Sequence, residues 1–154
     1  MVNTGSPAQH AEKSREFAVA TRLLIEAGMP VRAASDAYYL VFHLAEALLA
    51  TIGASADTHA GVHKLLARDF VKNGPLARDV SQRFTHLMGD RHNADHGVDG
   101  EIEEIGAQRA VISAAILAGE MLDVLETRES DSAITALRRD VDALLTSARP
   151  LTPP

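Results

Sequence analysis

Apolar residues recur every three or four positions through most of this chain, which is the spacing of amphipathic helices. Runs of glycine, proline, serine and asparagine interrupt the pattern and divide it into six segments. We expect helices over about 7–27, 31–52, 59–72, 76–96, 101–126 and 132–147. No useful length alternates apolar with polar residues, so strands are not expected. The predicted fold class is all-α, an up-and-down bundle of four to five helices with an extra C-terminal helix.

The apolar stripe of each segment predicts which side chains face the core. In the first segment the stripe is Phe17, Ala20, Leu24 and Ala27. In the second it is Ala34, Tyr38, Val41, Ala45, Leu48 and Ile52. Tyr38 is therefore expected to be packed rather than catalytic. His43 and Glu46 share the opposite side with Tyr39, where they line a groove, form a dimer contact or make a surface pair.

Length and composition limit the domain organisation and the chemistry. The chain has 154 residues and no cysteine, which excludes disulfides, thiolate zinc sites and a cysteine nucleophile. We expect a polar N-terminal arm over 1–8, a helical bundle over 9–126, a C-terminal helix over 127–149 and a tail over 150–154. Neither a signal peptide nor a membrane span is recognisable, which predicts a cytoplasmic protein.

Charge is unevenly distributed along the chain. The net charge is −6, which argues against a surface that is basic throughout. Residues 58–92 nevertheless carry six basic and three acidic side chains, whereas residues 93–130 carry two basic and nine acidic ones. The sequence thus allows a local anion site beside an acidic element.

Arg91 is the residue whose position is most informative. It falls on the same helical stripe as Val80, Phe84, Leu87 and Ala94, so its guanidinium points at the core or at a partner. Burying it without an anion would be costly. The anion is either Asp95, one turn further along, or a phosphate or carboxylate ligand. The simplest structural alternative is an intrahelical Arg91–Asp95 pair with His96 exposed.

Two further patterns involve residues of the third segment. The side chains of Lys64, Arg68 and Lys72 recur at every fourth position and form one basic edge, which either contacts phosphates or is simply solvated. His59 and His63 stand at i and i+4, a spacing that can hold a metal ion. Because a third ligand is not evident, we expect no metal, with His59 packed near the helix start and His63 facing solvent.

Four stretches of the sequence together resemble HEPN domains, the higher-eukaryote and prokaryote nucleotide-binding helical bundles. They read S-D-A-Y-Y-L-V-F-H at 35–43 with A-L-L at 47–49, T-H-A-G-V at 58–62, F-V-K-N-G at 70–74, and R-H-N-A-D-H-G at 91–97. The likeness spans about residues 9–126. It implies a helical bundle that forms a homodimer.

The resemblance also implies a chemistry. Catalytic members of the family carry an R-x(4–6)-H motif with a polar residue after the arginine, and Arg91, His92 and His96 match it. Such members resemble metal-independent endoribonucleases of toxin or defence type that need no cofactor. Arg91 would hold the scissile phosphate, and His96 would act as acid or base. Beyond the resemblance, we expect Asn93 or Asp95 to orient these two residues. The basic edge of Lys64, Arg68 and Lys72 would contact further phosphates unless it is simply a solvated face.

The chain also departs from the patterns of two branches of the family. One branch reads R-x-x-A-D-Y, so that His96 stands where a tyrosine is usual. The toxin branch paired with a nucleotidyltransferase reads R-x4-H-x-Y, and here Val98 replaces that tyrosine. The alternative function is therefore a non-catalytic module that binds a nucleotide-like ligand or a separate nucleotidyltransferase-type antitoxin.

Overall fold

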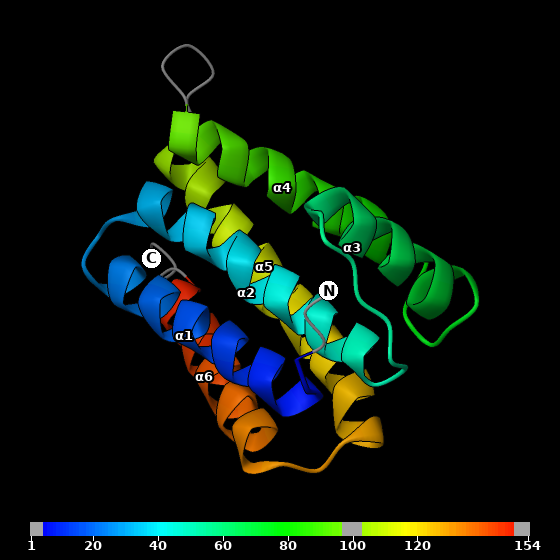
Figure 1. The fold of residues 1–154 in the computed structure, drawn as a ribbon. Coiled ribbons are helices and arrows are strands. Elements are labelled where there is room, and N and C mark those ends of the chain that lie inside the picture. The colour runs from blue at the N-terminus through cyan, green and yellow to red at the C-terminus, as the bar shows by residue number, and fades with distance from the viewer. Residues whose placement is uncertain (1–4, 97–102, 150–154) are drawn as a thin grey trace.

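The computed structural model describes residues 5–96 and 103–149, which form an all-α bundle (Figure 1). The elements in chain order are α1 (Pro7–Glu26), α2 (Pro30–Ala50), α3 (His59–Leu66), a π-helix η1 (Ala67–Lys72), α4 (Val80–His96), α5 (Glu104–Arg128) and α6 (Ser132–Ala148). No strand occurs in these two ranges. The predicted fold class is confirmed, including the additional helix at the C-terminal end.

The helix α2 is the centre of the bundle. It packs against α1, α3, α4 and α5, and α6 lies against α1 and α5 on the side away from α3 (Figure 1). Fully buried leucines and alanines fill the space around α2 and α5. Within the described ranges no helix is both long enough and apolar enough to cross a membrane.

Small residues at the centre of the contact bring α1 against α2. The fully buried side chains of α1 are Ala11, Ser14, Ala18 and Thr21, about one position away from the predicted stripe. Of that stripe, Phe17 and Leu24 are partly buried and pack on the core, whereas Ala27 is exposed. Ser14 Oγ donates a hydrogen bond to the carbonyl of Leu40 at 2.7 Å. Small residues let two helices approach closely, and their hydroxyls find backbone partners, so burying them costs little.

The third predicted segment is not a single regular α-helix. It changes from α-helix to π-helix at Ala67, and the chain then folds back tightly on η1. The amide of Leu76 donates to the carbonyl of Phe70 at 2.8 Å, and a Cβ on Gly74 would lie 2.5 Å from the Phe70 Cα. Only glycine fits there. Because of this return, α4 begins at Val80 rather than at Leu76 as predicted.

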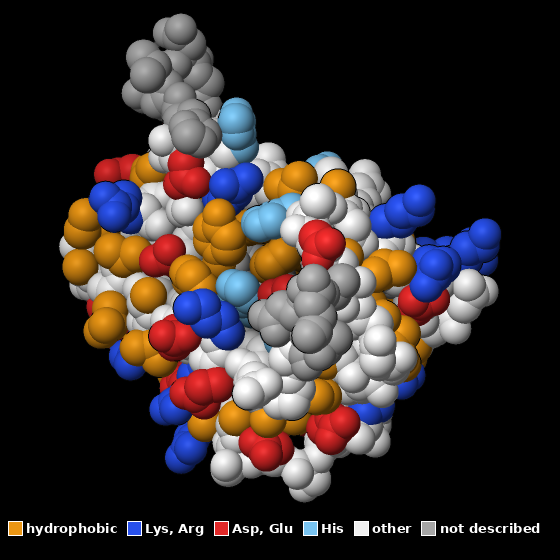
Figure 2. Space-filling view, in the orientation of Figure 1, with side chains coloured by type: hydrophobic (Ala, Val, Ile, Leu, Met, Phe, Trp, Pro, Cys, Tyr) orange, Lys and Arg blue, Asp and Glu red, His pale blue; other side chains and the backbone are white. Residues whose placement is uncertain are grey.

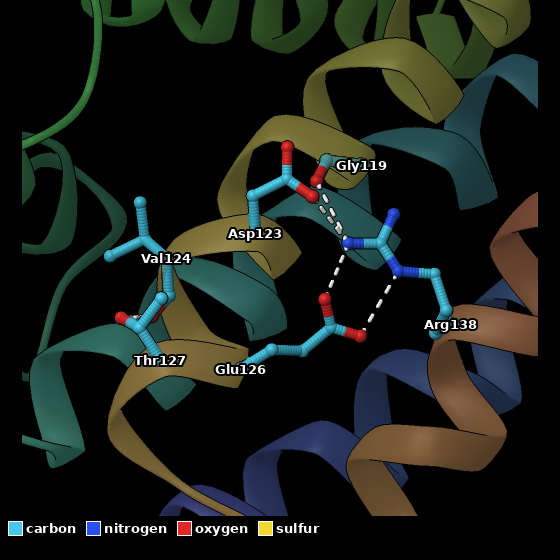
Figure 3. Close-up of polar contacts among 6 residues, drawn as sticks. All are labelled: Gly119, Asp123, Val124, Glu126, Thr127 and Arg138. Carbon is cyan, nitrogen blue, oxygen red and sulfur yellow. Dashed lines mark hydrogen bonds and ion pairs between the residues drawn. The ribbon is translucent and has the colours of Figure 1, made fainter.

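An ion-pair cluster fastens α6 to α5 (Figure 3). Arg138 of α6 donates to Asp123 at 2.6 Å and to both carboxylate oxygens of Glu126, at 2.7 and 3.1 Å. The carbonyl of Gly119 accepts a longer bond at 3.5 Å. The two carboxylates raise the pKa of Arg138. Such fork-like contacts are geometrically specific, so this cluster fixes the register of the two helices.

Candidate functional site

Arg91 points inward from α4 onto the aromatic side chains of α2, which is one of the two directions that its place on the apolar stripe allowed. Its guanidinium carbon lies 5.3 Å from the centre of the Tyr38 ring and 5.7 Å from that of Tyr39. The side chain is 21% exposed. Cation–π attraction to the two rings replaces part of the hydration that this charge has lost.

The polar contacts of Arg91 are few and long. Its Nη1 lies 3.4 Å from the Tyr39 hydroxyl and 3.5 Å from Asp95 Oδ2. Its Nε is buried and has no hydrogen-bond partner among the described residues. The intrahelical pair with Asp95 is therefore present, but it leaves part of the hydrogen-bonding capacity of the guanidinium unused.

The Tyr38 ring, which Arg91 contacts, carries a hydroxyl that lies within hydrogen-bonding distance of two histidines of α3. The hydroxyl lies 3.0 Å from His59 Nδ1 and 3.2 Å from His63 Nε2. Tyr38 itself is fully buried, as predicted, and burial raises its pKa to about 12. The hydroxyl therefore keeps its proton at neutral pH and can donate one hydrogen bond while it accepts another.

The expectation that His63 faces solvent was wrong. Its ring stacks on Phe84 with the ring centres 3.7 Å apart, and burial lowers its pKa to about 4. The imidazole turns inward because α4 presents an aromatic surface that the sequence of α3 alone does not reveal. His59 stacks on Phe42 at 4.1 Å. Since both histidines meet the Tyr38 hydroxyl, their i, i+4 spacing serves a hydrogen-bond network.

A groove runs beside these residues between α1, α2 and the start of α3. Its volume is about 560 Å³, and its lining includes His10, His43, Glu46 and His59. Glu46 Oε1 lies 2.7 Å from His43 Nδ1 and 3.8 Å from His10 Nδ1. The groove alternative for the His43–Glu46 pair is thus the one that the structure favours. Figure 2 shows histidine side chains in the middle of this face, among hydrophobic and charged ones. No group of three or more potential ligands arranged to hold a metal occurs among the described residues.

The other residues of the R-x4-H motif lie at the end of α4. His92 and Asn93 are exposed. Asp95 lines a polar pocket with Arg32 and Asp36, and burial, with the Asp95 charge, raises the pKa of Asp36. The helix ends at His96, whose side chain lies outside the described residues, as does Val98.

The basic residues of the third segment form a separate surface. Lys64, Arg68 and Lys72 line one groove together with Arg78, so the expected basic edge exists despite the π-helix. Arg68 also pairs with the neighbouring Asp69 at 2.9 Å. None of the described side chains that contact Arg91 lines this groove. The groove is therefore separate from the Arg91 site, and its positive charges could hold an anionic chain.

Comparison with known proteins places this geometry in a family. The sequence model of the HEPN domain matches residues 8–126. A Methanocaldococcus jannaschii protein named "Putative toxin" is 33% identical over 93 residues, which are 60% of this chain and 69% of that protein. A Thermotoga maritima protein named "UPF0332 protein" is 29% identical over 92 residues, 60% of this chain and 70% of that protein. A second M. jannaschii protein named "Putative toxin" is 30% identical over 100 residues, 65% of this chain and 66% of that protein.

The match begins within α1, ends at Glu126 of α5 and includes every residue that contacts Arg91. It covers well over half of the chain, and the all-α bundle fits it. This chain therefore belongs to the HEPN domain family.

Proposed function

We propose that this protein is a metal-independent endoribonuclease of toxin or defence type. Arg91 holds the scissile phosphate, and His96 acts as acid or base on the ribose 2′-hydroxyl or on the leaving oxygen. Asn93, Asp95 and His92 support these two residues at the end of α4. The HEPN family and the names of two relatives support the toxin class, and the match of Arg91 and His96 to the R-x(4–6)-H motif of catalytic HEPN domains supports the chemistry.

The burial and the contacts of Arg91 are the main support for this proposal. Its guanidinium is four-fifths buried, rests on two tyrosine rings and has a single carboxylate at 3.5 Å. A guanidinium held this way is preorganised and only loosely neutralised. A phosphodiester offers it two oxygens in fork geometry, and the developing negative charge of the phosphorane strengthens that contact in the transition state.

We further propose that the protein works as a homodimer in which Arg91 and His96 of both protomers face one cleft. An isologous contact along α4 would place two guanidinium groups around one phosphodiester. The basic edge of Lys64, Arg68 and Lys72 would then hold a flanking part of the RNA. Light scattering at micromolar concentration tests this arrangement, and a monomeric mass would contradict it.

One observation favours a second function. Asp95 lies 3.5 Å from Arg91, so the guanidinium has an anionic partner even when no ligand is bound. This arrangement is stable in a domain that only binds a ligand or a protein and catalyses nothing. In that case the same surface takes up a nucleotide-like ligand or a separate nucleotidyltransferase-type antitoxin, and no RNA is cleaved.

The experiment that separates the two functions is cleavage of a mixed RNA pool by the purified protein, with and without EDTA. We expect cleavage that EDTA does not inhibit and products that end in a 2′,3′-cyclic phosphate. The absence of cleavage, combined with saturable binding of a nucleotide, would favour the binding module. Cleavage that EDTA abolishes would contradict the metal-independent mechanism.

A further inference from the structure

We propose that His59 is the base that takes the proton of the ribose 2′-hydroxyl when a phosphodiester is held by Arg91 of the same protomer. The inference rests on the proposed RNA cleavage and adds to it a catalytic residue from α3, outside the R-x4-H motif.

The two side chains meet on the same pair of aromatic rings. The centre of the His59 ring lies 5.8 Å from that of Tyr38 and 6.0 Å from that of Tyr39. The Arg91 guanidinium carbon lies 5.3 and 5.7 Å from the same two centres. Arg91 and His59 therefore contact the same two tyrosine rings of α2, and the Arg91 charge is near enough to lower the pKa of His59, although 32 positions separate the two residues in the sequence.

A hydrogen-bond chain orients the His59 ring. Its Nδ1 lies 3.0 Å from the Tyr38 hydroxyl, which in turn lies 3.2 Å from His63 Nε2. In the order that suits a base, His59 Nδ1–H donates to the Tyr38 oxygen, and the Tyr38 O–H donates to His63 Nε2. The same order serves when His59 is protonated, because Nδ1 remains a donor. The lone pair is then on His59 Nε2, which makes no hydrogen bond to any residue in the described ranges.

The surroundings keep His59 neutral until it acts. Burial lowers its pKa, the Arg91 charge and His43 lower it further, and Glu46 raises it. The ring also lines the groove between α1 and α2, which gives a substrate access to it. Among the described residues, the titratable or charged groups that contact the ring, act on its pKa or line the same groove come from four helices and one loop. They are His10 and Lys13 from α1, Tyr38, Tyr39, His43 and Glu46 from α2, Asp57 from the preceding loop, His63 from α3, and Arg91 from α4.

The reaction step balances without a metal or an oxidant. The His59 Nε2 lone pair takes the 2′-hydroxyl proton, and the 2′-oxygen attacks phosphorus while Arg91 binds the non-bridging oxygens. The P–O5′ bond breaks, and its electron pair leaves with the 5′-oxygen, which takes a proton from protonated His96, the acid of the proposed cleavage. Water then carries the proton from His59 to His96, so that both histidines return to their starting states. The products are a 2′,3′-cyclic phosphate and a 5′-hydroxyl.

The test uses three variants of the full chain on an RNA that the wild type cleaves. His59→Asn keeps a donor near the Nδ1 position but has no titratable group. Tyr38→Phe keeps the ring beneath Arg91 but removes the hydroxyl, which only positions His59. His86→Asn is the matched control, since His86 is an exposed histidine of α4 on a different groove. Circular dichroism verifies that each variant retains its helices.

We expect His59→Asn to lower kcat by about 10²- to 10⁴-fold and to remove the limb of the pH–rate profile that falls below pH 6.5. Tyr38→Phe lowers kcat with little change in KM, and it shifts that limb, an effect that a merely structural role would not produce. His86→Asn leaves both unchanged. A folded His59→Asn variant that cleaves at the wild-type rate, or that keeps the acidic limb, overturns the role of His59 alone. A wild type that cleaves no RNA overturns the proposed cleavage itself and this role with it.

Discussion

The Arg91 guanidinium lies over the ring of Tyr38, 5.3 Å from its centre, and the hydroxyl of that same ring is bound by two histidines. The arginine of α4 and the histidines of α3 are thus coupled through one side chain of α2. The contacts of Arg91 explain how a charged residue can lie on the apolar stripe of its helix. The faces of two aromatic rings and one carboxylate compensate for the hydration that its guanidinium has lost.

Acid should destabilise the fold through His63. Its pKa is about 4 in the folded protein, below the ordinary histidine value of 6.5, so between those two values the unfolded chain binds more protons and stability falls as pH decreases. Above pH 6.5, His63 does not change the pH dependence of the free energy of unfolding. With partial solvent screening the loss is on the order of 1–2 kcal/mol. Thermal unfolding from pH 7 to pH 4 measures it, and a folded His63→Leu variant should show a flatter pH dependence. An equally steep dependence in that variant would contradict this explanation.

Enlarging Ser14 should separate α1 from α2. Ser14→Ala removes only the hydrogen bond to Leu40 and should cost about 0.5–1.5 kcal/mol. Ser14→Leu must also find room in a closely packed contact, so we expect it to cost roughly 1–3 kcal/mol more. Chemical denaturation measures both. Glu16→Leu is the control, because Glu16 is exposed on the same helix, and it should stay near wild-type stability. A Ser14→Leu variant as stable as that control would show that the contact is not close.

Removing Arg138 should loosen α6. Arg138→Ala abolishes the contacts to Asp123 and Glu126 and leaves two carboxylates facing each other, so we expect a loss of about 1–2 kcal/mol and a lower Tm. Arg139→Ala is the matched control, since Arg139 is exposed on the same helix. Equal Tm values for the two variants would mean that the cluster contributes nothing to stability.

The basic groove and the Arg91 site should respond differently to salt. Lys64→Ala and Lys72→Ala should weaken RNA binding and reduce the salt dependence of the binding constant by about one counterion each. The rate of cleavage at saturating RNA should not change. Binding measured between low and moderate salt tests this directly. An unchanged salt slope would identify these lysines as an ordinary solvated face.

The sequence predicted the burial of Tyr38, and it limited Arg91 to facing the core or a partner, because both lie on regular apolar stripes, which encode helix orientation directly. It did not predict that Ser14 and Thr21 are buried, because close helix contacts select small side chains that a hydrophobic pattern does not register. The inward turn of His63 depends on Phe84 of another helix. The π-helix at Ala67 depends on how the chain returns past Gly74. Contacts of these kinds are tertiary, so local periodicity carries little information about them.

RNA cleavage by Arg91 variants tests directly whether Arg91 holds the scissile phosphate. Purified wild type, Arg91→Ala, Arg91→Lys and the surface control Arg139→Ala are assayed in EDTA on one RNA, with helicity and oligomeric mass measured in parallel. We predict that Arg91→Ala and Arg91→Lys lose cleavage at least about 10²-fold while they remain folded, because a lysine cannot bind a phosphodiester in fork geometry, and that Arg139→Ala is fully active. Cleavage by folded Arg91→Ala at the wild-type rate would show that Arg91 does not hold the scissile phosphate.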